Sequence, residues 1–517
     1  MINEKVIFDV SQNKNKMMKT YGIDFLTFED FKEIDNGKST IDLNETSKEQ
    51  IIISQQNVAK IIASGQTVYG INTGFGPLCD TKISEEETRQ LQHNLLISHA
   101  VGVGNPIKKE ISKTMLIAKA HALSKGFSGV TLEVVERILL MIKKDIIPVV
   151  PEKGSVGASG DLAPLSHLFL PLIGEGKVWE GDKIITTKEA LAKHHLEPLN
   201  LSAKEGLGLI NGTQFILSHA LHGLKKFEYL LNLADVVGAL SLEAYEGSPS
   251  PFKKELHEIR AFKGTILVAE RMRNLLKNSE IAYSHQDCGR VQDPYSLRCI
   301  PQVHGASRNA FFHLQELAEI ELNSVTDNPI VISDEEAISG GNFHGQPLAM
   351  ALDYATIAAS ELGNISDRRQ YLLIEGKYGL PKLLTESSGL NSGFMIPQYT
   401  SAALCTENKT LCFPASADSI PTSLGQEDHV SMGSISGRKF NQVLDNVERI
   451  LAIELMYACQ GLEFRRPKKS SPYLEQVFAK VRTICPKLED DRLIGDDINN
   501  IIDLLQTDDF KDLIMSF

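Results

Sequence analysis

The chain has 517 residues, of which 42 % are hydrophobic and 23 % charged, so it can bury a large core and belongs with globular proteins. Its 53 basic and 66 acidic residues give a net charge of −13, which argues against a general nucleic-acid or anionic-membrane partner. The first residues show no signal-peptide pattern, and no stretch is long and apolar enough to span a bilayer. The 7 cysteines are scattered without a C-x-x-C pair, so we expect reduced thiols in a cytoplasmic protein and no zinc site.

The N-terminal region predicts short strands and helices, with a helix over residues 48–63 and a glycine-rich loop after it. Residues 67–77 read TVYGINTGFGP, a short strand that runs into this loop. A tyrosine on such a loop can act as a base if its pKa, about 10 in model peptides, is lowered. Tyr69 is therefore a candidate base, and a surface loop without a catalytic role is an equally good interpretation.

Ser84 and Glu87 have the spacing of a capping box and predict the start of a helix that carries His99 on its apolar face. On periodicity alone, His99 is more often a hydrogen-bonded core residue than a ligand contact. Helical segments continue to about residue 144, and extended chain leads from there into the next motif.

Residues 154–165 read GSVGASGDLAPL. The amide nitrogen of Gly160 can attack the carbonyl carbon of Ala158 and close a five-membered ring. Loss of water from that ring and of the Ser159 hydroxyl leaves an exocyclic methylidene, a strong electrophile made from the backbone itself. Gly160 has no Cβ and tolerates the tight geometry. We expect Asp161 to cap the following helix, whose positive end would favour electron flow into the electrophile. For an isolated Ala-Ser-Gly, an ordinary turn and cap is the commoner outcome.

Long helical patterns prevail from about residue 205 to 465, among them a helix from near Asn211 to about Ala244 and one over 440–455. Few strand signals accompany them. We therefore expect a mainly α fold, a long antiparallel helical bundle with a smaller mixed N-terminal region that carries the Ala-Ser-Gly loop. The expected division of the chain is 1–204, 205–466 and 467–517, the last being a C-terminal helical segment.

Further motifs lie between or on these helices. In residues 292–299, QDPYSLRC, Arg298 could grip a carboxylate in bidentate fashion beside Tyr295, or the two could form a surface pair. Residues 339–347, SGGNFHGQP, place Phe343 on a loop, where docking on its own core is the alternative. Glu407 by itself would be part of a solvated helix face. We interpret residues 426–432, QEDHVSM, as capping of a helix start.

These motifs, from about residue 69 to about residue 466, resemble the aromatic amino acid ammonia-lyases, and most closely the histidine-specific branch (histidases). This family builds the cofactor MIO (4-methylideneimidazole-5-one) from Ala-Ser-Gly. The resemblance implies that MIO forms autocatalytically from Ala158, Ser159 and Gly160, with no metal and no external cofactor. It also implies a fumarase/aspartase-like helical architecture and a homotetramer with shared active sites, although the Gly-Ser-Ser-x-Met-Pro-x-Lys loop of the fumarase group is missing.

The resemblance assigns roles to individual residues. Tyr69 would be the general base on a lid loop, Glu407 a second candidate base facing a substrate imidazole, and Tyr295 a residue near the reacting atoms. Ser98-His99 is typical of the histidine-specific members, whereas phenylalanine-specific members tend to have Phe-Leu and tyrosine-specific members His-Leu. The residues expected to bind substrate are His99, Asn211, Gln292, Arg298 and Phe343, with Arg298 on the carboxylate and Phe343 packed at the MIO pocket.

The resemblance therefore implies non-oxidative deamination of L-histidine to trans-urocanate and ammonium, the first step of histidine degradation. A tyrosine or phenylalanine ammonia-lyase, or a MIO-dependent 2,3-aminomutase, is the alternative, and sequence does not separate lyase from mutase cleanly. A non-catalytic helical scaffold is disfavoured because the candidate residues are all present. Ile300 and His304 differ from the form typical of some histidases, and neither is assigned to the chemistry.

Overall fold

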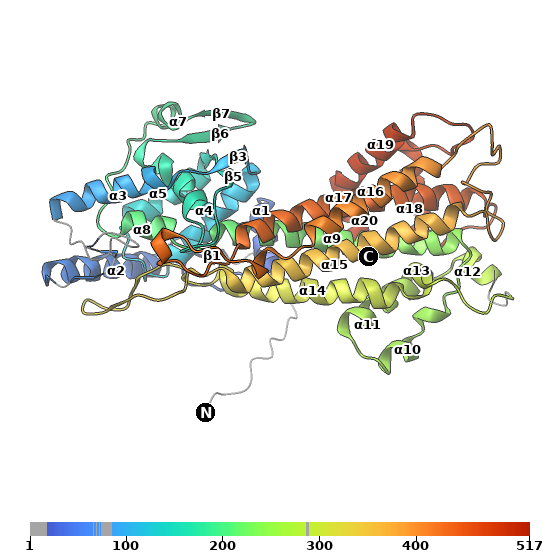
Figure 1. Cartoon of the computed structure of the whole chain (residues 1–517), viewed down its shortest axis with the longest axis horizontal. Helices are drawn as coiled ribbons and strands as arrows, with labels where there is room; N and C mark the ends of the chain where they lie inside the picture. The colour runs from blue at the N-terminus through green and yellow to red at the C-terminus, as the bar shows by residue number, and fades with distance from the viewer. Residues whose placement is uncertain (1–17, 66, 69, 72, 74–84, 286–288) are drawn as a thin grey trace.

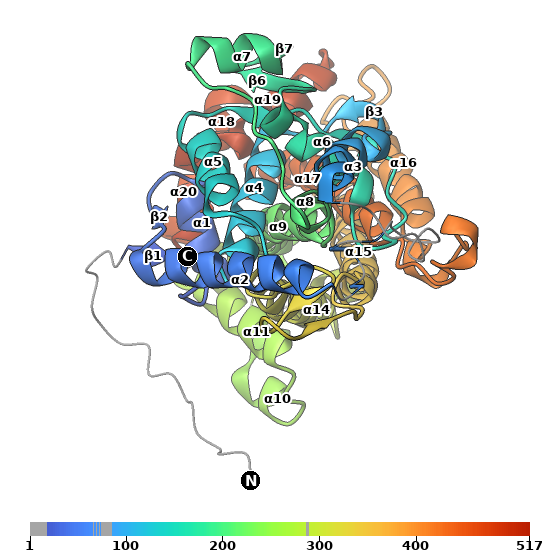
Figure 2. The ribbon, with the colours of Figure 1, turned by 90° about the vertical axis from the view of Figure 1, so that its left-hand side faces the viewer.

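The computed structural model describes residues 18–65, 67–68, 70–71, 73, 85–285 and 289–517. Long helices run along the length of the molecule, and the short N-terminal helices and small sheets gather at one end (Figures 1 and 2). The prediction of a mainly α fold with a mixed N-terminal region is confirmed.

The N-terminal region is built from short and medium helices, several of which begin after a capping side chain. In α2, which covers the helix expected over 48–63, the side chain of Asn44 accepts a hydrogen bond from the Ser47 N–H. The helix expected to carry His99 is α3, and the capping serine expected before it, Ser84, lies outside the described residues. The helices of this region are α1 (Phe28–Asp35), α2 (Glu45–Ala63), α3 (Glu85–His99), α4 (Lys109–Leu123), α5 (Leu132–Lys143), α6 (Leu162–Phe169), α7 (Thr187–Lys193) and α8 (Glu205–Ile210).

The strands of the described chain are short and form four small sheets. Each sheet has only two or three short strands, so the helices supply most of the hydrophobic core. The sheets are the parallel pair β1 (Lys19–Thr20) and β2 (Ile41–Asp42), the antiparallel pair β3 (Val103–Pro106) and β5 (Pro151–Lys153), the three-stranded β4 (Ile147–Pro148), β6 (Lys177–Glu180) and β7 (Lys183–Thr186), and the pair β8 (Ile330–Val331) and β9 (Ala337–Ile338).

The bundle consists of long helices that alternate in direction along the chain. Asp235 pairs with His304 and Phe227 with Phe311, so α14 runs antiparallel to α9. The alternation puts the N-termini of α9, α15 and α17 at the same end, the one that carries the N-terminal region (Figure 1). The long helices are α9 (Gln214–Ala244), α14 (Ile300–Leu322), α15 (Gln346–Ile374), α16 (Met395–Leu411) and α17 (Gly433–Glu463).

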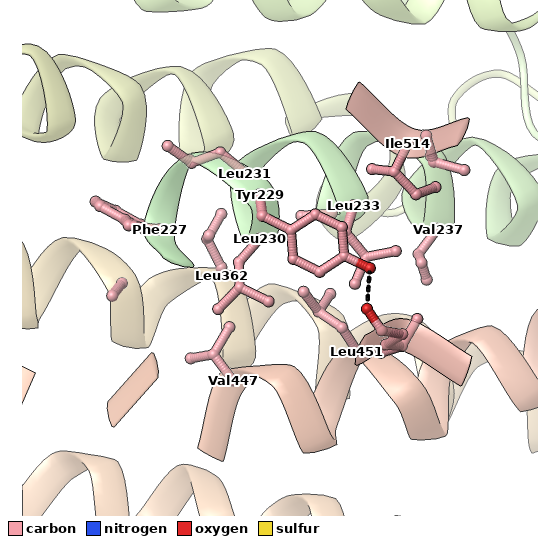
Figure 3. Packing of buried hydrophobic residues seen from close by; sticks show 14 of the residues in the cluster. Phe227, Tyr229, Leu230, Leu231, Leu233, Val237, Leu362, Val447, Leu451 and Ile514 are labelled. Carbon is pink, nitrogen blue, oxygen red and sulfur yellow. Dashed lines mark hydrogen bonds between the residues drawn. The ribbon is translucent and has the colours of Figure 1, made fainter. Parts of the chain in front are cut away.

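The remaining helices cover the other end and one flank of the bundle. In Figure 3, Tyr229 on α9 donates a hydrogen bond to the Leu505 carbonyl at 2.9 Å and fixes a C-terminal helix on the core. No described helix is both long and apolar enough to cross a membrane. These helices are α10 (Lys254–Glu258), α11 (Lys263–Leu275), α12 (Glu280–Ser284), α13 (Tyr295–Arg298), α18 (Pro472–Ile484), α19 (Ile494–Gln506) and α20 (Asp508–Met515). The division at 204/205 and 466/467 stays a prediction.

A fully buried ion pair joins α15 to α17 inside the bundle. The Arg369 guanidinium donates to both oxygens of Glu454, at 2.5 and 2.9 Å, and the Ser241 hydroxyl donates to the same carboxylate at 2.6 Å. Both side chains of the pair have 0 % exposure. Removing one partner of such a pair leaves an uncompensated buried charge.

We therefore expect Glu454→Leu to lower the free energy of unfolding by about 3 kcal/mol or more. Denaturant unfolding followed by circular dichroism measures this, and the double variant Arg369→Met/Glu454→Leu should regain much of the loss because it leaves neither charge behind. An unchanged unfolding midpoint in Glu454→Leu would show that the pair does not stabilise the bundle.

Candidate active site

The Ala-Ser-Gly motif forms a tight turn between β5 and α6. Ser159 has φ +51° and Gly160 φ +79°, so two successive residues are left-handed. An L-residue pays about 1–2 kcal/mol for this conformation, so the surroundings must hold Ser159 in place. A Cβ on Gly160 would overlap the carbonyl of Gly212, which pairs with Gly160 as an isolated parallel bridge. The turn folds the backbone back on itself, as ring closure between Gly160 and Ala158 requires.

Asp161 fixes the turn to the start of α9. Its backbone N–H donates to the Gly212 carbonyl at 2.7 Å, and its carboxylate accepts the Ile216 N–H at 3.0 Å and the Ser155 hydroxyl at 3.1 Å. The prediction that its side chain caps the following helix is wrong: it makes no cap bond to α6 and caps α9 instead. The reason is that Gly212 pairs with Gly160 and brings the N-terminus of α9 within reach. Burial raises the pKa of Asp161 to about 7.

The N-termini of three long helices meet beside this turn. Gly433, the first residue of α17, packs on Ile216 of α9 and Ala349 of α15 so closely that a Cβ there would crowd both. Gly345, just before α15, packs on Ile216 in the same way. Each helix N-terminus carries a partial positive charge. Their convergence favours negative charge that develops at the Ala-Ser-Gly turn.

Glu427 contacts the serine of the motif directly. The Ser159 hydroxyl donates to Oε1 of Glu427 at 2.8 Å, while Oε2 accepts the hydroxyls of Thr422 at 2.9 Å and Ser423 at 2.7 Å. The interpretation of this block as helix-start capping is wrong for Glu427, because α17 begins at Gly433 without a side-chain cap bond. Sequence reasoning missed Glu427 although its block carried a family resemblance.

His99 lies at the C-terminus of α3, half-buried. Its Nδ1–H donates to the Leu95 carbonyl at 2.9 Å, which leaves Nε2 as the acceptor of a neutral imidazole. Burial lowers the pKa of His99, whereas the Leu95 bond and the charge of Glu427 oppose that shift. Gly102, just after α3, packs on Gly154 at the start of the Ala-Ser-Gly loop, so His99 lies on the same side of the molecule as Ser159.

Asn211 immediately precedes Gly212, which pairs with Gly160, and its backbone carbonyl is held by a buried lysine. Lys119 donates from Nζ to the Asn211 carbonyl. Nearby, Lys204 and Asp327 form an ion pair at 2.7 Å with 0 % and 3 % exposure. Burial lowers the pKa of Lys119 to about 8, with Asp327 opposing that shift and Lys204 adding to it. The peptide bond between Asn211 and Gly212 is therefore anchored to Lys119 of α4.

The lowered pKa of Lys119 predicts a pH dependence of stability. The unfolded chain binds more protons than the folded chain between pH 8 and 10.5, so the free energy of unfolding should rise across this window by up to about 3 kcal/mol. Below pH 8 the full cost of the buried charge applies. Lys119→Met has no such group, so the difference between the two proteins' unfolding free energies should change with pH in this window. A difference that is constant from pH 7 to about 10.5 would contradict the expectation.

Within the described part of one chain, two predicted residues lie far from the turn. Tyr295 and Arg298 are on α13, at the opposite end of the bundle from β5 (Figure 1). The start of α15 lies beside the turn, and Arg369, near its other end, donates to the Ser296 carbonyl at 3.5 Å. The helical rise between these points is about 35 Å. The Arg298 guanidinium lies 4.5 Å from the Tyr295 ring, which is 71 % exposed.

Of the other predicted residues, Phe343 lies near the turn, Gln292 lies near α13, and Glu407 lies between these two places. Glu407 is exposed on α16, next to the buried Asn408, which accepts a hydrogen bond from Asn446 at 3.0 Å; Asn446 is about 20 Å along α17 from its start. Gln292 is exposed just before α13, and Phe343 is half-buried just before α15. Tyr69 lies outside the described residues. One chain thus brings together Ala158, Ser159, Gly160, His99 and Asn211, but neither Arg298 nor Glu407.

The described residues fit ring formation. The left-handed turn, the glycine that admits no Cβ and the bonded Ser159 hydroxyl are the features that a cyclising Ala-Ser-Gly needs. In the described ranges, no group of 3 or more His, Cys, Asp or Glu side chains is arranged to hold a metal ion.

Comparison with known proteins agrees with this geometry. A model of the aromatic amino acid lyase family matches residues 26–483. Histidine ammonia-lyase of Caldanaerobacter subterraneus subsp. tengcongensis is 44 % identical over 491 residues, 95 % of this chain and 96 % of that protein. The crystal structure of histidine ammonia-lyase from Trypanosoma cruzi superimposes with a TM-score of 0.88 at 41 % identity, covering 97 % of this chain and 95 % of that one. Tyrosine aminomutase from Streptomyces globisporus gives a TM-score of 0.91 at 34 % identity, over 97 % and 99 %. The chain therefore belongs to the aromatic amino acid lyase family.

Proposed function

We propose that this chain is a histidine ammonia-lyase, a carbon–nitrogen lyase that converts L-histidine to trans-urocanate and ammonium in the first step of histidine degradation. The observation that carries the proposal is the left-handed Ala-Ser-Gly turn, with Glu427 hydrogen-bonded to Ser159 and His99 on the same side of the molecule. Curated relatives named histidine ammonia-lyase are 43 % to 47 % identical to the chain. A neutral imidazole with a free acceptor nitrogen suits a substrate that carries an imidazole N–H.

The proposed cofactor is MIO, formed autocatalytically from Ala158, Ser159 and Gly160. When formed, this electrophile turns the amine of the substrate into a better leaving group. The converging helix N-termini support the assignment, because they stabilise negative charge at the turn. The required atoms all come from the chain.

The remaining roles belong to side chains that bind and orient the substrate. Arg298 holds the carboxylate in bidentate fashion, and His99 hydrogen-bonds the imidazole ring. Asn211 and Phe343 line the site beside the turn. Gln292 and Tyr295 belong to the same segment as Arg298 and enter the site together with it. The base that removes the β-proton is Tyr69 or Glu407, and such a base typically contributes about 100- to 10,000-fold.

These roles require more than one copy of the chain. Arg298 lies about 35 Å from the Ser159 turn along the bundle. The exposed Tyr295 ring is available to another copy. We infer a homotetramer in the cytoplasm whose active sites combine the Ala-Ser-Gly turn of one subunit with α13 of another.

Substrate specificity tests the proposal. Purified protein is mixed separately with L-histidine, L-tyrosine and L-phenylalanine, and the conjugated product is followed by ultraviolet absorbance. We expect a signal with L-histidine that exceeds that of L-phenylalanine by at least about 100-fold in kcat/KM, because the phenyl ring has no N–H to donate to His99. The tyrosine phenol can donate to His99, so the expectation of a weaker signal with L-tyrosine rests on the relatives named histidine ammonia-lyase. A larger signal with L-tyrosine or L-phenylalanine would overturn the histidine assignment.

The structural likeness to tyrosine aminomutase favours one second candidate, a 2,3-aminomutase. Such an enzyme returns ammonia to the β-carbon, so its product is a β-amino acid. Chromatography of the reaction mixtures separates the two candidates. Free ammonium in equal amount to urocanate supports the lyase, whereas a β-amino acid product supports the mutase.

A further inference from the structure

We propose that Glu427 is a catalytic residue of cofactor formation, which takes the Cα proton of Ser159 and delivers a proton to the Ser159 hydroxyl as that hydroxyl leaves. The proposal rests on the proposed function, because it concerns the ring that the Ala-Ser-Gly turn forms. Glu427 and Ser159 are 268 positions apart in the chain, so only the fold brings them together.

The carboxylate is held in place before any reaction. Oε1 of Glu427 accepts the Ser159 hydroxyl at 2.8 Å. Oε2 accepts the hydroxyls of Thr422 and Ser423, and the Thr422 N–H donates to the Glu427 carbonyl at 2.9 Å. The side chain therefore loses little freedom when it acts, which favours efficient proton transfer.

The segment around Glu427 is tied to the loop that carries Ser159. The Met432 N–H donates to the Val156 carbonyl at 2.9 Å, and the Ser434 hydroxyl donates to the Ser155 carbonyl at 2.6 Å. The distance between Glu427 and Ser159 is thus set by further bonds between the two segments, rather than by one flexible side chain.

The nearby alternative carboxylate is already occupied. Asp161 accepts the Ile216 N–H and the Ser155 hydroxyl, and it caps α9. Of these two buried or half-buried acids, only Glu427 accepts the hydroxyl that must leave. The bond to the Ser159 hydroxyl thus favours Glu427 over Asp161 as the acid that acts on it.

Ring formation releases two water molecules, and the second concerns Glu427. The first water takes the Ala158 carbonyl oxygen and the amide hydrogens of Ser159 and Gly160. The nitrogen of Gly160 bonds to the carbonyl carbon of Ala158, and the bond from that carbon to the Ser159 nitrogen becomes a double bond. The second takes the Ser159 hydroxyl and the Ser159 Cα hydrogen. The C–H electron pair becomes the Cα=Cβ double bond, and the Cβ–Oγ pair leaves with the oxygen.

Hydroxide is a poor leaving group, so the second step needs a proton at Oγ. Glu427 takes up the proton lost from Cα and delivers a proton to Oγ, so its carboxylate ends unchanged and the oxygen leaves as water. Positioned acid–base groups of this kind typically contribute about 100- to 10,000-fold. The step needs no oxidant, reductant or co-reactant.

The test measures ring formation itself by intact mass, at intervals after purification of the full-length protein. Wild type should carry a mass lower by two water molecules. Glu427→Gln should complete this loss at least about 10-fold more slowly and accumulate chains that have lost one water or none. Asp428→Asn, which neutralises the exposed neighbouring acid, is the matched control and should behave like wild type.

A second measurement distinguishes chemistry from folding. In Glu427→Ala, formate in the buffer should restore the slow mass loss in proportion to its concentration, because a small carboxylate can enter the vacated space; a merely structural role would not respond to formate. Circular dichroism confirms that the variants are folded. Loss of two waters from Glu427→Gln at the wild-type rate would overturn the proposal. Slow ring formation in Glu427→Ala that formate does not speed up would overturn it as well. Wild type without the mass loss would instead overturn the proposed function.

Discussion

Ser159→Ala is expected to lose at least about 10,000-fold in kcat with L-histidine, which corresponds to about 5 kcal/mol of transition-state stabilisation. Alanine has no hydroxyl to eliminate, so no methylidene can form at this position. The amine of the substrate then remains a poor leaving group, and the binding residues alone cannot compensate. Steady-state kinetics by ultraviolet absorbance of urocanate measures the loss.

The fold should survive this change. The side chain of Ser159 makes its described bond to Glu427 rather than to the core, so the circular dichroism spectrum should match that of wild type. Ser387→Ala, at an exposed serine outside the site, is the matched control and should keep full activity. Activity within about 10-fold of wild type in folded Ser159→Ala would show that the electrophile is not needed.

Two inactive variants are expected to restore activity when they assemble together. Arg298→Met should lose at least about 100-fold in kcat/KM, because it removes the bidentate grip on the carboxylate. Ser159→Ala lacks the electrophile. If Ser159 of one subunit meets Arg298 of another, a mixed assembly contains sites in which both residues are intact. Random mixing of equal amounts should restore about one quarter of the wild-type sites.

Co-expression of the two variants with different affinity tags isolates the mixed assemblies. A double variant, Ser159→Ala/Arg298→Met, co-expressed with Ser159→Ala is the control and should stay inactive because every turn then lacks Ser159. Mixed assemblies that are no more active than the single variants would contradict the shared site. That result would require Arg298 to reach the turn of its own chain across the length of α15.

Local sequence patterns predicted the elements well, since they depend on neighbours in the chain. The helices over 48–63 and from near Asn211 to Ala244 appear as α2 and α9. The Ala-Ser-Gly turn needs glycine at 160, and the structure gives the reason in the Gly212 carbonyl that occupies the Cβ position. The need for glycine at position 160 was therefore visible in the residue types of the motif.

Contacts between distant segments were not predictable from the pattern. Asp161 has the sequence position of a cap for α6, yet it caps α9, because Gly212 brings that helix closer. In the sequence, Lys119 is an ordinary helix residue. Only the fold brings its Nζ to the Asn211 carbonyl. The hydrogen bond between Glu427 and Ser159 likewise joins distant segments, and no sequence spacing predicts it.

The mass of the active protein tests most directly whether the chain makes its own electrophile. The protein is purified, shown to form urocanate from L-histidine, and then analysed by intact mass spectrometry with peptide mapping. We expect a mass lower by two water molecules, localised to the peptide that contains Ala158, Ser159 and Gly160. An active protein whose peptide carries its full unmodified mass would contradict the central claim, that the chain makes its own electrophile.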